Sequence, residues 1–372
     1  MAKSVYIADV CKEIFAGGDV PKDALSYEKT AEYNVPIFSN GEKNCGLYGY
    51  TNNARVKEPS ITVSARGTIG YTAIRTEPFV PVVRLITLTP KSEVIDLDYL
   101  FYATQNYKFE GSGTSIPQLT VPILKKYKFP LPEMSHQKAI AVKFEKLDQL
   151  ISLRKQQLAK LDELIKARFV EMFGNIIRND KSWPIHNFSD IASSRLGKML
   201  DAKQQTGKYS YPYLANFNVQ WFSFNVDNLN QMDFNEAEQK EFELRDGDLL
   251  VCEGGEIGRC AVWHNEIQPC FFQKALHRVR CNRQLVQPDY LAWWFKYNCN
   301  HGGFAEIAGA KATIAHLPGI KLKQLQVALP TLSLQNEFAA FVERVDQQKQ
   351  TVQQSLEKLE LMKKALMQEY FG

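Results

Sequence analysis

Three acidic residues, Asp246, Asp248 and Glu253, stand upstream of Lys274 in the second half of the sequence. Acidic residues beside a lysine are typical of metal-dependent nuclease sites, where carboxylates hold the metal ion. The stretch Asp246-Gly247-Asp248 is also typical of a turn that leads into a strand, because Asp and Gly favour turn conformations. We favour the turn and expect no catalytic site here.

No other stretch has the spacing of a catalytic or cofactor motif. The glycines of "GGEIG" (254–258) lack the full G-x-G-x-x-G pattern, and His264, His277 and Glu266 lack metal-ligand spacing. The sequence contains no G-x-x-x-x-G-K-[ST] phosphate loop and no N-P-P-[FY] or D-P-P-[FY] adenine-methylation motif. The seven cysteines include no C-x-x-C pair, which favours reduced thiols over a zinc ribbon.

The bulk properties leave several classes of protein open. A chain of 372 residues is long enough for two or three domains with their own cores. Its net charge of +4 permits a nucleic-acid partner only if basic residues gather on one face. No apolar run approaches the roughly 20 residues of a membrane span, and "MAKSVYIADV" lacks a secretory apolar core. We therefore expect a cytoplasmic protein that does not enter a membrane.

The sequence is internally duplicated. Residues 131–174 align without a gap on residues 329–372, and 17 of the 44 aligned positions are identical. Chance would give about two or three, since a random match has a frequency of roughly one in twenty. The two copies end in the related stretches "ARFVEMFG" and "ALMQEYFG".

Each copy predicts one long helix. Ser135 and Ser333 can cap its start, and Gly174 and Gly372 suit its end. Apolar residues recur at the alternating three- and four-residue spacing of a coiled-coil seam, interrupted by Arg154 in the first copy and Lys349 in the second. The seam residues are Ile140, Phe144, Leu147, Ile151, Leu158, Leu161 and Ile165 in the first copy, and Phe338, Val342, Val345, Val352, Leu356 and Leu359 in the second. We expect the two helices, each roughly 58 Å long at 1.5 Å per residue, to pair; the alternative is that each lies on its own globule.

The segments before the two helices, which we call the first head (1–130) and the second head (175–328), resemble each other more faintly. "SARGTIGYTAI" (64–74) parallels "CEGGEIGRCAV" (252–262), and "LDYLFYATQ" (97–105) parallels "PDYLAWWFK" (288–296). Short alternating runs such as "SITVSARG" and "GDLLVCEG" predict strands, and 97–107 and 288–299 predict helices. The expected fold is therefore α+β: two α/β heads alternating with two long helices (131–174 and 329–372).

Duplicated units joined helix to helix predict a pseudo-twofold arrangement. The helices would form an antiparallel coiled coil with the heads at opposite ends. Successive faces of the DNA major groove recur about every 34–36 Å, which such a spacer can reach. Two unlike heads would then recognise two different half-sites of one interrupted, asymmetric DNA sequence.

Several short motifs give this layout a family resemblance over essentially the whole chain. "YPYLANFNV" (211–219) is similar to the pattern Y-P-Y-L-x-x-x-N-V, and "LPEMSHQ" and "LPTLSLQ" are similar to the helix start L-P-x-x-x-x-Q. "GTSIPQL" (113–119) and "KATIAHL" (311–317) precede those starts. In this order and doubled, they resemble the specificity (S) subunit of type I restriction-modification systems.

The resemblance implies two target-recognition domains and a subunit without catalysis of its own. It implies double-stranded DNA, two DNA adenine methyltransferase subunits and two restriction/translocase subunits as partners. It also implies no cofactor in this chain, because S-adenosylmethionine, ATP and Mg²⁺ would be bound by those partners.

Base recognition needs hydrogen-bonding side chains on loops: Arg or Lys for guanine, Asn or Gln for adenine. In the first head the candidates are Ser39, Asn40, Lys43, Asn44, Tyr50, Asn52, Asn53, Arg55, Arg66, Thr68, Ser115 and Gln118. In the second head they are Arg195, Lys198, Asn216, Asn218, Gln220, Trp221, Glu256, Arg259, Lys311, Thr313 and His316.

Many of these residues have a plainer interpretation. Asn and Ser often only complete turns, and Asn218 is expected to do so. Lys198, Lys203 and Lys208 suit phosphate contacts, while Glu256 suits either cytosine N4 or the support of Arg259. Two rival functions remain: a coiled-coil scaffold that never binds DNA, and a stand-alone DNA methyltransferase or nuclease.

Overall fold

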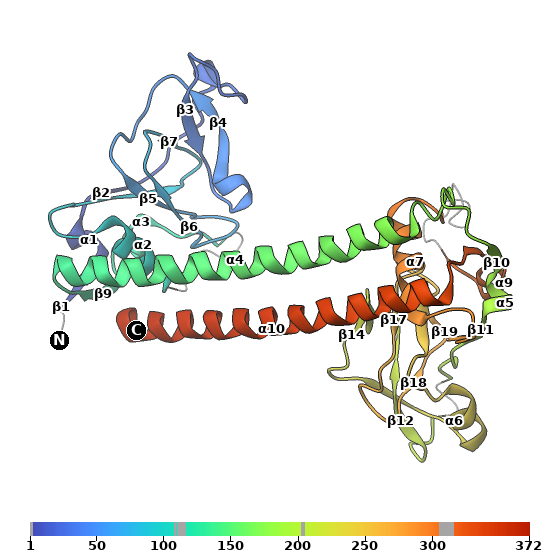
Figure 1. Ribbon diagram of the computed structural model, residues 1–372. Helices are drawn as coiled ribbons and strands as arrows, with labels where there is room; N and C mark the ends of the chain where they lie inside the picture. Colours follow the sequence, from blue (N-terminus) through green and yellow to red (C-terminus); the bar gives the residue numbers. More distant parts are fainter. Residues whose placement is uncertain (1–2, 108, 110–116, 202–204, 305–315) are drawn as a thin grey trace. The chain divides into compact units, whose positions relative to one another are not determined.

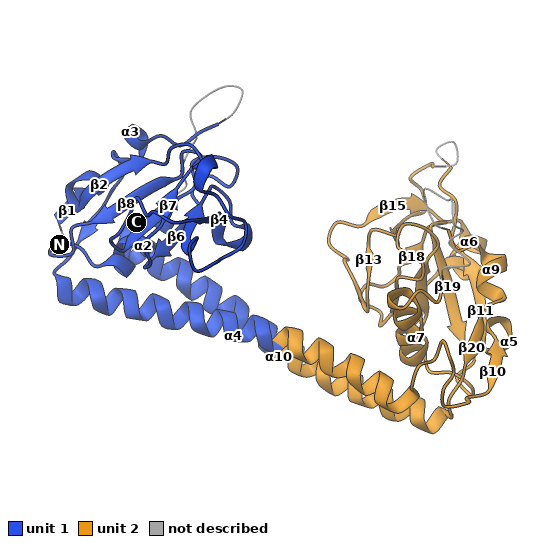
Figure 2. Ribbon diagram, turned by 90° about the horizontal axis from the view of Figure 1, so that it is seen from above, with its two compact units in different colours: residues 1–157, 352–372 blue, residues 158–351 orange. Residues whose placement is uncertain are grey.

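The computed structural model describes residues 3–107, 109, 117–201, 205–304 and 316–372. Its contacts divide the chain into two compact units (Figure 2). Unit 1 comprises Met1–Gln157 and Val352–Gly372, and unit 2 comprises Leu158–Thr351. Each unit thus holds one head together with part of both long helices.

The first head is built on a four-stranded antiparallel sheet with the order β2-β8-β5-β6. Strands β2, β5 and β6 are labelled in Figure 1, and β8 is labelled in Figure 2. These strands are β2 (Cys11–Ala16), β5 (Ser60–Val63), β6 (Thr72–Arg75) and β8 (Ile86–Pro90). The inner strands β5 and β8 are buried along their whole length, as their β-branched sequences "SITV" and "ITLTP" suit. The strand expected in "SITVSARG" is confirmed as β5.

Smaller elements complete the first head. A second sheet has the order β4-β3-β7, and β1 pairs with β9 beside the start of the first long helix. The remaining bounds are β1 (Lys3–Tyr6), β3 (Val35–Phe38), β4 (Leu47–Thr51), β7 (Val80–Pro81), β9 (Lys128–Leu131), α1 (Ile7–Val10), α2 (Leu97–Gln105), α3 (Val121–Leu124) and the 3₁₀ turns η1 (Lys22–Ala24) and η2 (Lys43–Gly46). The Asp96 side chain accepts from the Tyr99 amide and caps α2.

The second head repeats this topology. Its sheets have the orders β11-β19-β16-β17 and β15-β12-β18, and β10 pairs with β20. The bounds are β10 (Ile185–Asn187), α5 (Phe188–Ile191), β11 (Ala192–Leu196), β12 (Ser210–Leu214), β15 (Asn230–Asp233), β16 (Leu249–Cys252), β17 (Cys260–Val262), β18 (Phe271–Phe272), β19 (Leu276–Cys281), α7 (Pro288–Asn300), α9 (Gly319–Lys323) and β20 (Gln326–Ala328). The duplication inferred from faint sequence echoes is therefore confirmed in the fold.

Two elements distinguish the second head from the first. A hairpin of β13 (Val219–Gln220) and β14 (Ser223–Phe224) follows β12, where the first head has only η2 after β3. Helix α6 (Glu236–Phe242) follows β15, where the first head has the loop 52–59. The Asn235 and Glu238 side chains form a capping box that fixes the start of α6.

The long helices α4 (Met134–Phe173) and α10 (Leu332–Phe371) pair within each unit. In unit 1 the α10 partner falls from Lys363 at Asp148 to Ser355 at Arg154, and in unit 2 it falls from Lys349 at Asp162 to Glu337 at Arg168, so the pairing is antiparallel as predicted. The contacts are Asp148–Lys363, Arg154–Ser355 and Lys155–Glu360 in unit 1, and Asp162–Lys349 and Arg168–Glu337 in unit 2. Every predicted seam residue is buried or half-buried. No helix in the described segments is both long and apolar enough to cross a membrane.

Both long helices start in the same way. Each begins one residue before the serine expected to cap it, so Ser135 and Ser333 lie in the first helical turn instead. The buried Gln137 accepts from the Asp96 amide at 2.9 Å and donates to the Pro132 carbonyl at 2.9 Å and the Val94 carbonyl at 3.2 Å.

The second start repeats these three bonds. Gln335 accepts from the Gln287 amide at 2.9 Å and donates to the Pro330 carbonyl at 2.8 Å and the Leu285 carbonyl at 3.1 Å. In each unit one glutamine therefore joins the helix start to the loop before α2 or α7.

The related stretches that end the two helices occupy equivalent cores. Phe173 lies 4.9 Å from the Tyr290 ring and 5.3 Å from the Phe338 ring in unit 2. In unit 1, Phe371 lies 5.1 Å from the Tyr99 ring and 5.8 Å from the Phe144 ring. Each terminal phenylalanine thus closes the apolar core between a head and the helix pair.

Candidate nucleic-acid interface

Three loop segments of the first head lie next to one another and are joined by hydrogen bonds. The Asn40 side chain accepts from the Ala65 amide at 2.7 Å, and the Gly41 amide donates to the Ser64 hydroxyl at 3.1 Å. The Leu119 amide donates to the Ala65 carbonyl at 2.9 Å. We call these segments, residues 39–46, 64–71 and 117–119, the first loop cluster.

Arg66 and Gln118 meet within the first loop cluster. The guanidinium donates through Nε and Nη2 to the Gln118 Oε1 atom, at 3.1 and 2.9 Å. Arg66 is half-buried and forms no ion pair with any residue that the structure describes. The neutral amide of Gln118 does not neutralise the charge of the half-buried guanidinium. Binding of a further hydrogen-bond acceptor by Arg66 therefore remains favourable.

The other candidates of this cluster differ in exposure. Lys43 and Asn44 are exposed on η2, and Thr68 is exposed on the turn after β5. Ser39 is half-buried, and its amide closes the loop on the Gly46 carbonyl at 2.8 Å. The amide group of Asn40 also donates to the Val83 carbonyl, so both ends of this side chain are occupied by backbone.

A second group of candidates lies apart from the first loop cluster. Asn52, Asn53 and Arg55 follow β4, whereas Lys43 and Asn44 precede it. The five residues of β4 span about 17 Å at 3.4 Å each, so these two groups of candidates lie at opposite ends of the strand.

Two of these side chains have neighbours within the head. Tyr50 lies in β4 and its backbone pairs with Ser26, and the Arg55 guanidinium lies 4.3 Å from the Phe15 ring centre. The eleven candidates of the first head that the structure describes therefore do not form a single surface.

The second head brings the equivalent three segments together. Arg259 donates through Nη2 to the Asn216 carbonyl at 2.9 Å, and the Leu317 amide donates to the Glu253 carbonyl at 2.7 Å. The exposed His316 pairs through its backbone with Gly254. We call residues 215–222, 252–260 and 316–317 the second loop cluster.

Glu256 is the centre of a polar network in the second loop cluster. The Trp221 Nε1 atom donates to Glu256 Oε1 at 2.7 Å, and Arg259 Nη1 lies 3.6 Å from Glu256 Oε2. Half of the Glu256 side chain is nevertheless exposed, at 48%. The carboxylate is therefore held in place while it can still accept from a ligand.

Lys296 belongs to this network and was not among the sequence candidates. Its ammonium lies 4.1 Å from the Trp221 ring centre, and burial lowers the pKa of this lysine. The signal in the sequence is a single cation inside the aromatic run "YLAWWFKYN", which by itself predicts only a helix.

Asn218 and Gln220 serve their own loop. Asn218 is buried, accepts from the Ala215 amide at 2.9 Å and donates to the Asn225 carbonyl at 3.0 Å, which is the supporting role that its residue type favoured. The exposed Gln220 donates to the Phe217 carbonyl at 3.1 Å.

Arg195 and Lys198 bind α6 instead of the second loop cluster. Arg195 pairs with Glu241 at 2.5 Å, and Lys198 donates to Glu238 and to the Asp233 carbonyl, both at 2.6 Å. Lys208 is exposed. Ser115, Lys203, Lys311 and Thr313 lie outside the described residues.

The acids that suggested a nuclease are not assembled as one. Asp248 is buried and accepts from Arg280 at 2.7 and 3.0 Å, and it also accepts from the Arg245 amide. Gly247 has a φ of +81°, which confirms the predicted turn. Among the described residues, no three His, Cys, Asp or Glu side chains are placed to hold a metal ion.

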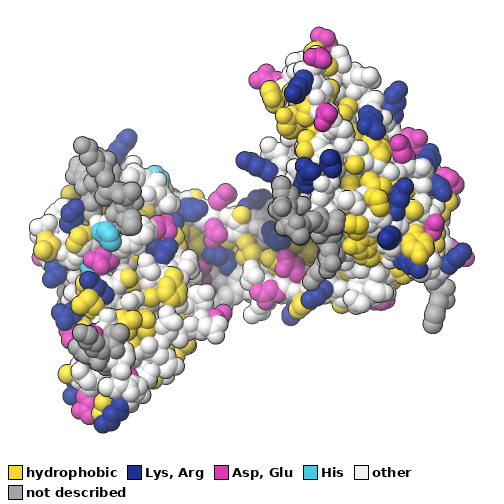
Figure 3. Space-filling view, turned by 180° about the vertical axis from the view of Figure 1, so that it is seen from behind, with side chains coloured by type: hydrophobic (Ala, Val, Ile, Leu, Met, Phe, Trp, Pro, Cys, Tyr) yellow, Lys and Arg dark blue, Asp and Glu magenta, His cyan; other side chains and the backbone are white. Residues whose placement is uncertain are grey.

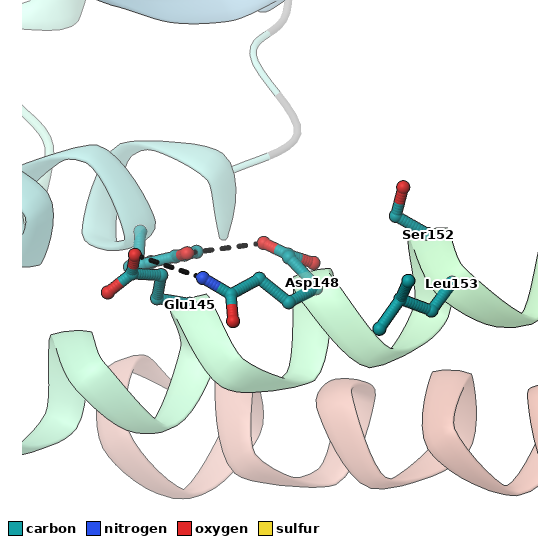
Figure 4. Close-up of a pocket in the computed structure, with 6 residues that line it drawn as sticks. Glu145, Asp148, Ser152 and Leu153 are labelled. Atoms are coloured by element: carbon teal, nitrogen blue, oxygen red, sulfur yellow. Dashed lines mark hydrogen bonds between the residues drawn. The ribbon is translucent and has the colours of Figure 1, made fainter.

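A hollow beside α4 in unit 1 is lined by acidic side chains, without the basic residues that both loop clusters contain. It is lined by Tyr102, Glu145, Asp148, Gln149, Ser152 and Leu153 (Figure 4). The Tyr102 hydroxyl donates to Asp148, and Gln149 donates to Glu145. Two carboxylates and no cation line this hollow, which makes it a poor site for phosphates.

Comparison with known proteins decides the family. Residues 2–163 and 180–361 match the family model described as "Type I restriction modification DNA specificity domain". The chain belongs to the type I restriction-modification specificity family. The family predicted from the doubled short motifs is thereby confirmed.

Relatives within the type I specificity family support the assignment. Two Mycoplasma pneumoniae proteins named as type I specificity subunits are 36% identical over 172 residues and 37% identical over 167 residues. The first match covers 43% of this chain and 47% of that protein, and the second covers 42% and 49%. The chain thus spans about half the length of these relatives.

Solved structures of type I systems share the fold. The S subunit of a type I system from M. genitalium matches with a TM-score of 0.62 and 15% identity, covering 100% of this chain and 96% of that chain. A structure solved in connection with complex assembly of the type I R-M system matches with a TM-score of 0.60 and 13% identity, covering 99% and 97%. The expected fold of two α/β heads with paired long helices is confirmed.

The surface charge of this member of the type I specificity family is mixed. On the face shown in Figure 3, Lys and Arg side chains are interspersed with Asp and Glu. A net charge of +4 distributed in this way gives no dominant basic patch on that face.

Proposed function

We propose that this chain is the non-catalytic DNA-recognition subunit of a type I restriction-modification complex. Each loop cluster would contact one half-site of an interrupted, asymmetric double-stranded DNA sequence. One observation carries the proposal: the two heads present the same three converging segments with different polar side chains. Such a pair of sites suits two half-sites that differ in sequence.

Partners would supply the chemistry. We infer two DNA adenine methyltransferase subunits and two restriction/translocase subunits, which would bind S-adenosylmethionine, ATP and Mg²⁺ themselves. Family membership supports the assembly, and so does the similarity to a structure solved in connection with complex assembly of the type I R-M system. The number of each partner rests on the family resemblance alone.

Mapping of N6-methyladenine in host DNA tests the function. Deletion of the gene for this chain should abolish methylation at one interrupted, asymmetric motif and leave other motifs unchanged. A methylation map that does not change on deletion would contradict the proposal.

DNA binding by the purified chain with its methyltransferase partner is a second test. A gel-shift assay should show specific binding that weakens steeply as salt rises, because phosphate contacts release counterions. An assembled complex that shifts no DNA would favour the scaffold function. Methylation or cleavage by this chain alone, with Mg²⁺ and S-adenosylmethionine, would favour the stand-alone enzyme.

A further inference from the structure

The turn after β5 in the first head and the turn after β16 in the second have the same backbone. Gly67 and Gly70 have φ values of +68° and +89°, and Gly255 and Gly258 have φ values of +79° and +77°. These values lie in the left-handed region that glycine adopts at little cost. The positions correspond in the alignment of 64–74 with 252–262.

The segment before each long helix is bonded to its turn by the same hydrogen bond. Leu119 donates to the Ala65 carbonyl in the first head, and Leu317 donates to the Glu253 carbonyl in the second. Because the backbones and their connections agree, turn geometry does not dictate which polar side chains the two turns carry.

The side chains on these turns are chemically opposite. The first turn presents Arg66, whose guanidinium has only donors and is held by Gln118. The second presents Glu256, whose carboxylate has only acceptors and is held by Trp221 and Arg259. In both cases a neighbouring side chain fixes the group before any ligand binds, which reduces the entropy lost on binding.

We propose that the two turns recognise opposite hydrogen-bonding patterns in the DNA major groove, an inference that rests on the proposed function. Arg66, positioned by Gln118, recognises a guanine through its N7 and O6 acceptors. Glu256, positioned by Trp221 and Arg259, accepts from the N4 amino group of a cytosine. One half-site therefore contains a guanine set by the first turn, and the other contains a cytosine set by the second.

The experiment uses the full chain co-expressed with its methyltransferase partner in a host that lacks adenine methylation, followed by methylation mapping. Arg66→Ala should change one guanine position of one half-site to any base, and Glu256→Gln should relax one cytosine position of the other. A good contact of this kind discriminates roughly 5- to 150-fold, which is the expected loss at each position.

Two matched controls remove the same charges at exposed positions outside both loop clusters. These are Lys57→Ala in the first head and Glu236→Gln in the second, and neither should change the motif. Gln118→Ala should partly relax the position that Arg66→Ala relaxes, and the double variant should relax no further position. Arg66→Lys keeps the charge and can still donate to guanine, but it loses the planar two-pronged donor, so it should weaken the guanine preference by less than Arg66→Ala does. This variant keeps the test valid if the alanine variant does not assemble.

Three results would overturn the inference. A uniform fall in methylation of all sequences with Arg66→Ala would mean a phosphate contact. An unchanged motif in both the Arg66 and Glu256 variants would mean that these turns do not recognise bases. The proposed function would still stand in that case, because the wild-type chain would direct methylation to a specific motif. Absence of any motif with the wild-type chain would overturn the proposed function together with the inference.

Discussion

Gln137 and Gln335 make the same three backbone contacts in the two units, whereas the equivalent turns of the two heads present Arg66 in one and Glu256 in the other. The difference follows from what each side chain contacts. The glutamines satisfy amides and carbonyls that every sequence has, so one residue type suits both copies. The turn residues Arg66 and Glu256 are only partly buried, so the fold leaves their residue types free to differ.

The largest loss of stability is expected from substitution of the terminal phenylalanines of the two long helices, and it tests whether the two units are equivalent. Phe173→Ala and Phe371→Ala should each cost about 3–5 kcal/mol, because each side chain is at most 4% exposed and packs against aromatic rings. Urea unfolding followed by circular dichroism measures both. All five tryptophans lie in unit 2, so tryptophan fluorescence should respond mainly to Phe173→Ala.

The exposed Val170 and Glu369 offer matched controls for these two variants. Val170→Ala and Glu369→Ala should change the free energy of unfolding by less than about 0.5 kcal/mol. A loss confined to one of the two phenylalanine variants would show that the two helix ends are not equivalent cores.

A smaller effect is expected at the glutamines of the helix starts. Gln137→Ala and Gln335→Ala each leave one amide and two carbonyls without a partner, at a cost on the order of 2–4 kcal/mol. Urea midpoints should fall by similar amounts in the two variants, and Lys138→Ala and Asn336→Ala are exposed neighbours for comparison. Unequal losses would argue that one copy holds its head by other contacts.

A pH test should separate the two heads. His277 pairs with Val251 across the sheet where Ile86 pairs with Val63, and burial lowers the pKa of this histidine. The unfolded chain then binds a proton more readily than the folded chain. The free energy of unfolding of unit 2 should therefore have its full value above about pH 6.5 and should fall as the pH is lowered below that value.

The measurement is the fluorescence-detected urea midpoint between pH 7.5 and pH 5.5. His277→Ile, which copies the first head, should lower stability overall because the Leu317 carbonyl loses its partner, but it should remove the dependence on pH. The same pH dependence in wild type and variant would assign the effect to another group.

The smallest effect is expected from a circular permutant opened between Gly174 and Trp183 with the old ends joined. Both chain ends belong to unit 1, and the segment to be opened is largely exposed. If the two units are equivalent, the permutant should fold with a stability within about 1 kcal/mol of the parent and keep the DNA binding proposed above. An insoluble permutant would count against the equivalence.

Much of the fold could be predicted because its signals are local. The seam from Ile140 to Ile165 follows the helical repeat, and "SITV" and "LLVC" carry the composition of buried strands. Glycines at 67 and 255 marked turns that the backbone does place in the left-handed region.

The candidate site was harder to predict because its contacts are distant in sequence. Residue type alone could not show that Lys198 binds Glu238 on α6, or that both ends of Asn40 are occupied by Ala65 and Val83. Lys296 was missed because its partner Trp221 stands 75 residues away. A loop side chain that looks available for binding in a sequence often makes hydrogen bonds to the backbone around it instead.

The sequence by itself determined the duplication, the paired long helices and the family, since these depend on repeated patterns along the chain. Only the tertiary structure decided which polar side chains converge, because loops far apart in the chain meet through sheet order and not through spacing. Arg66 with Gln118 and Glu256 with Trp221 are pairs of this kind. Their support by a neighbour, which fixes a charge in place at a turn, is what turns a residue type into a candidate for base recognition.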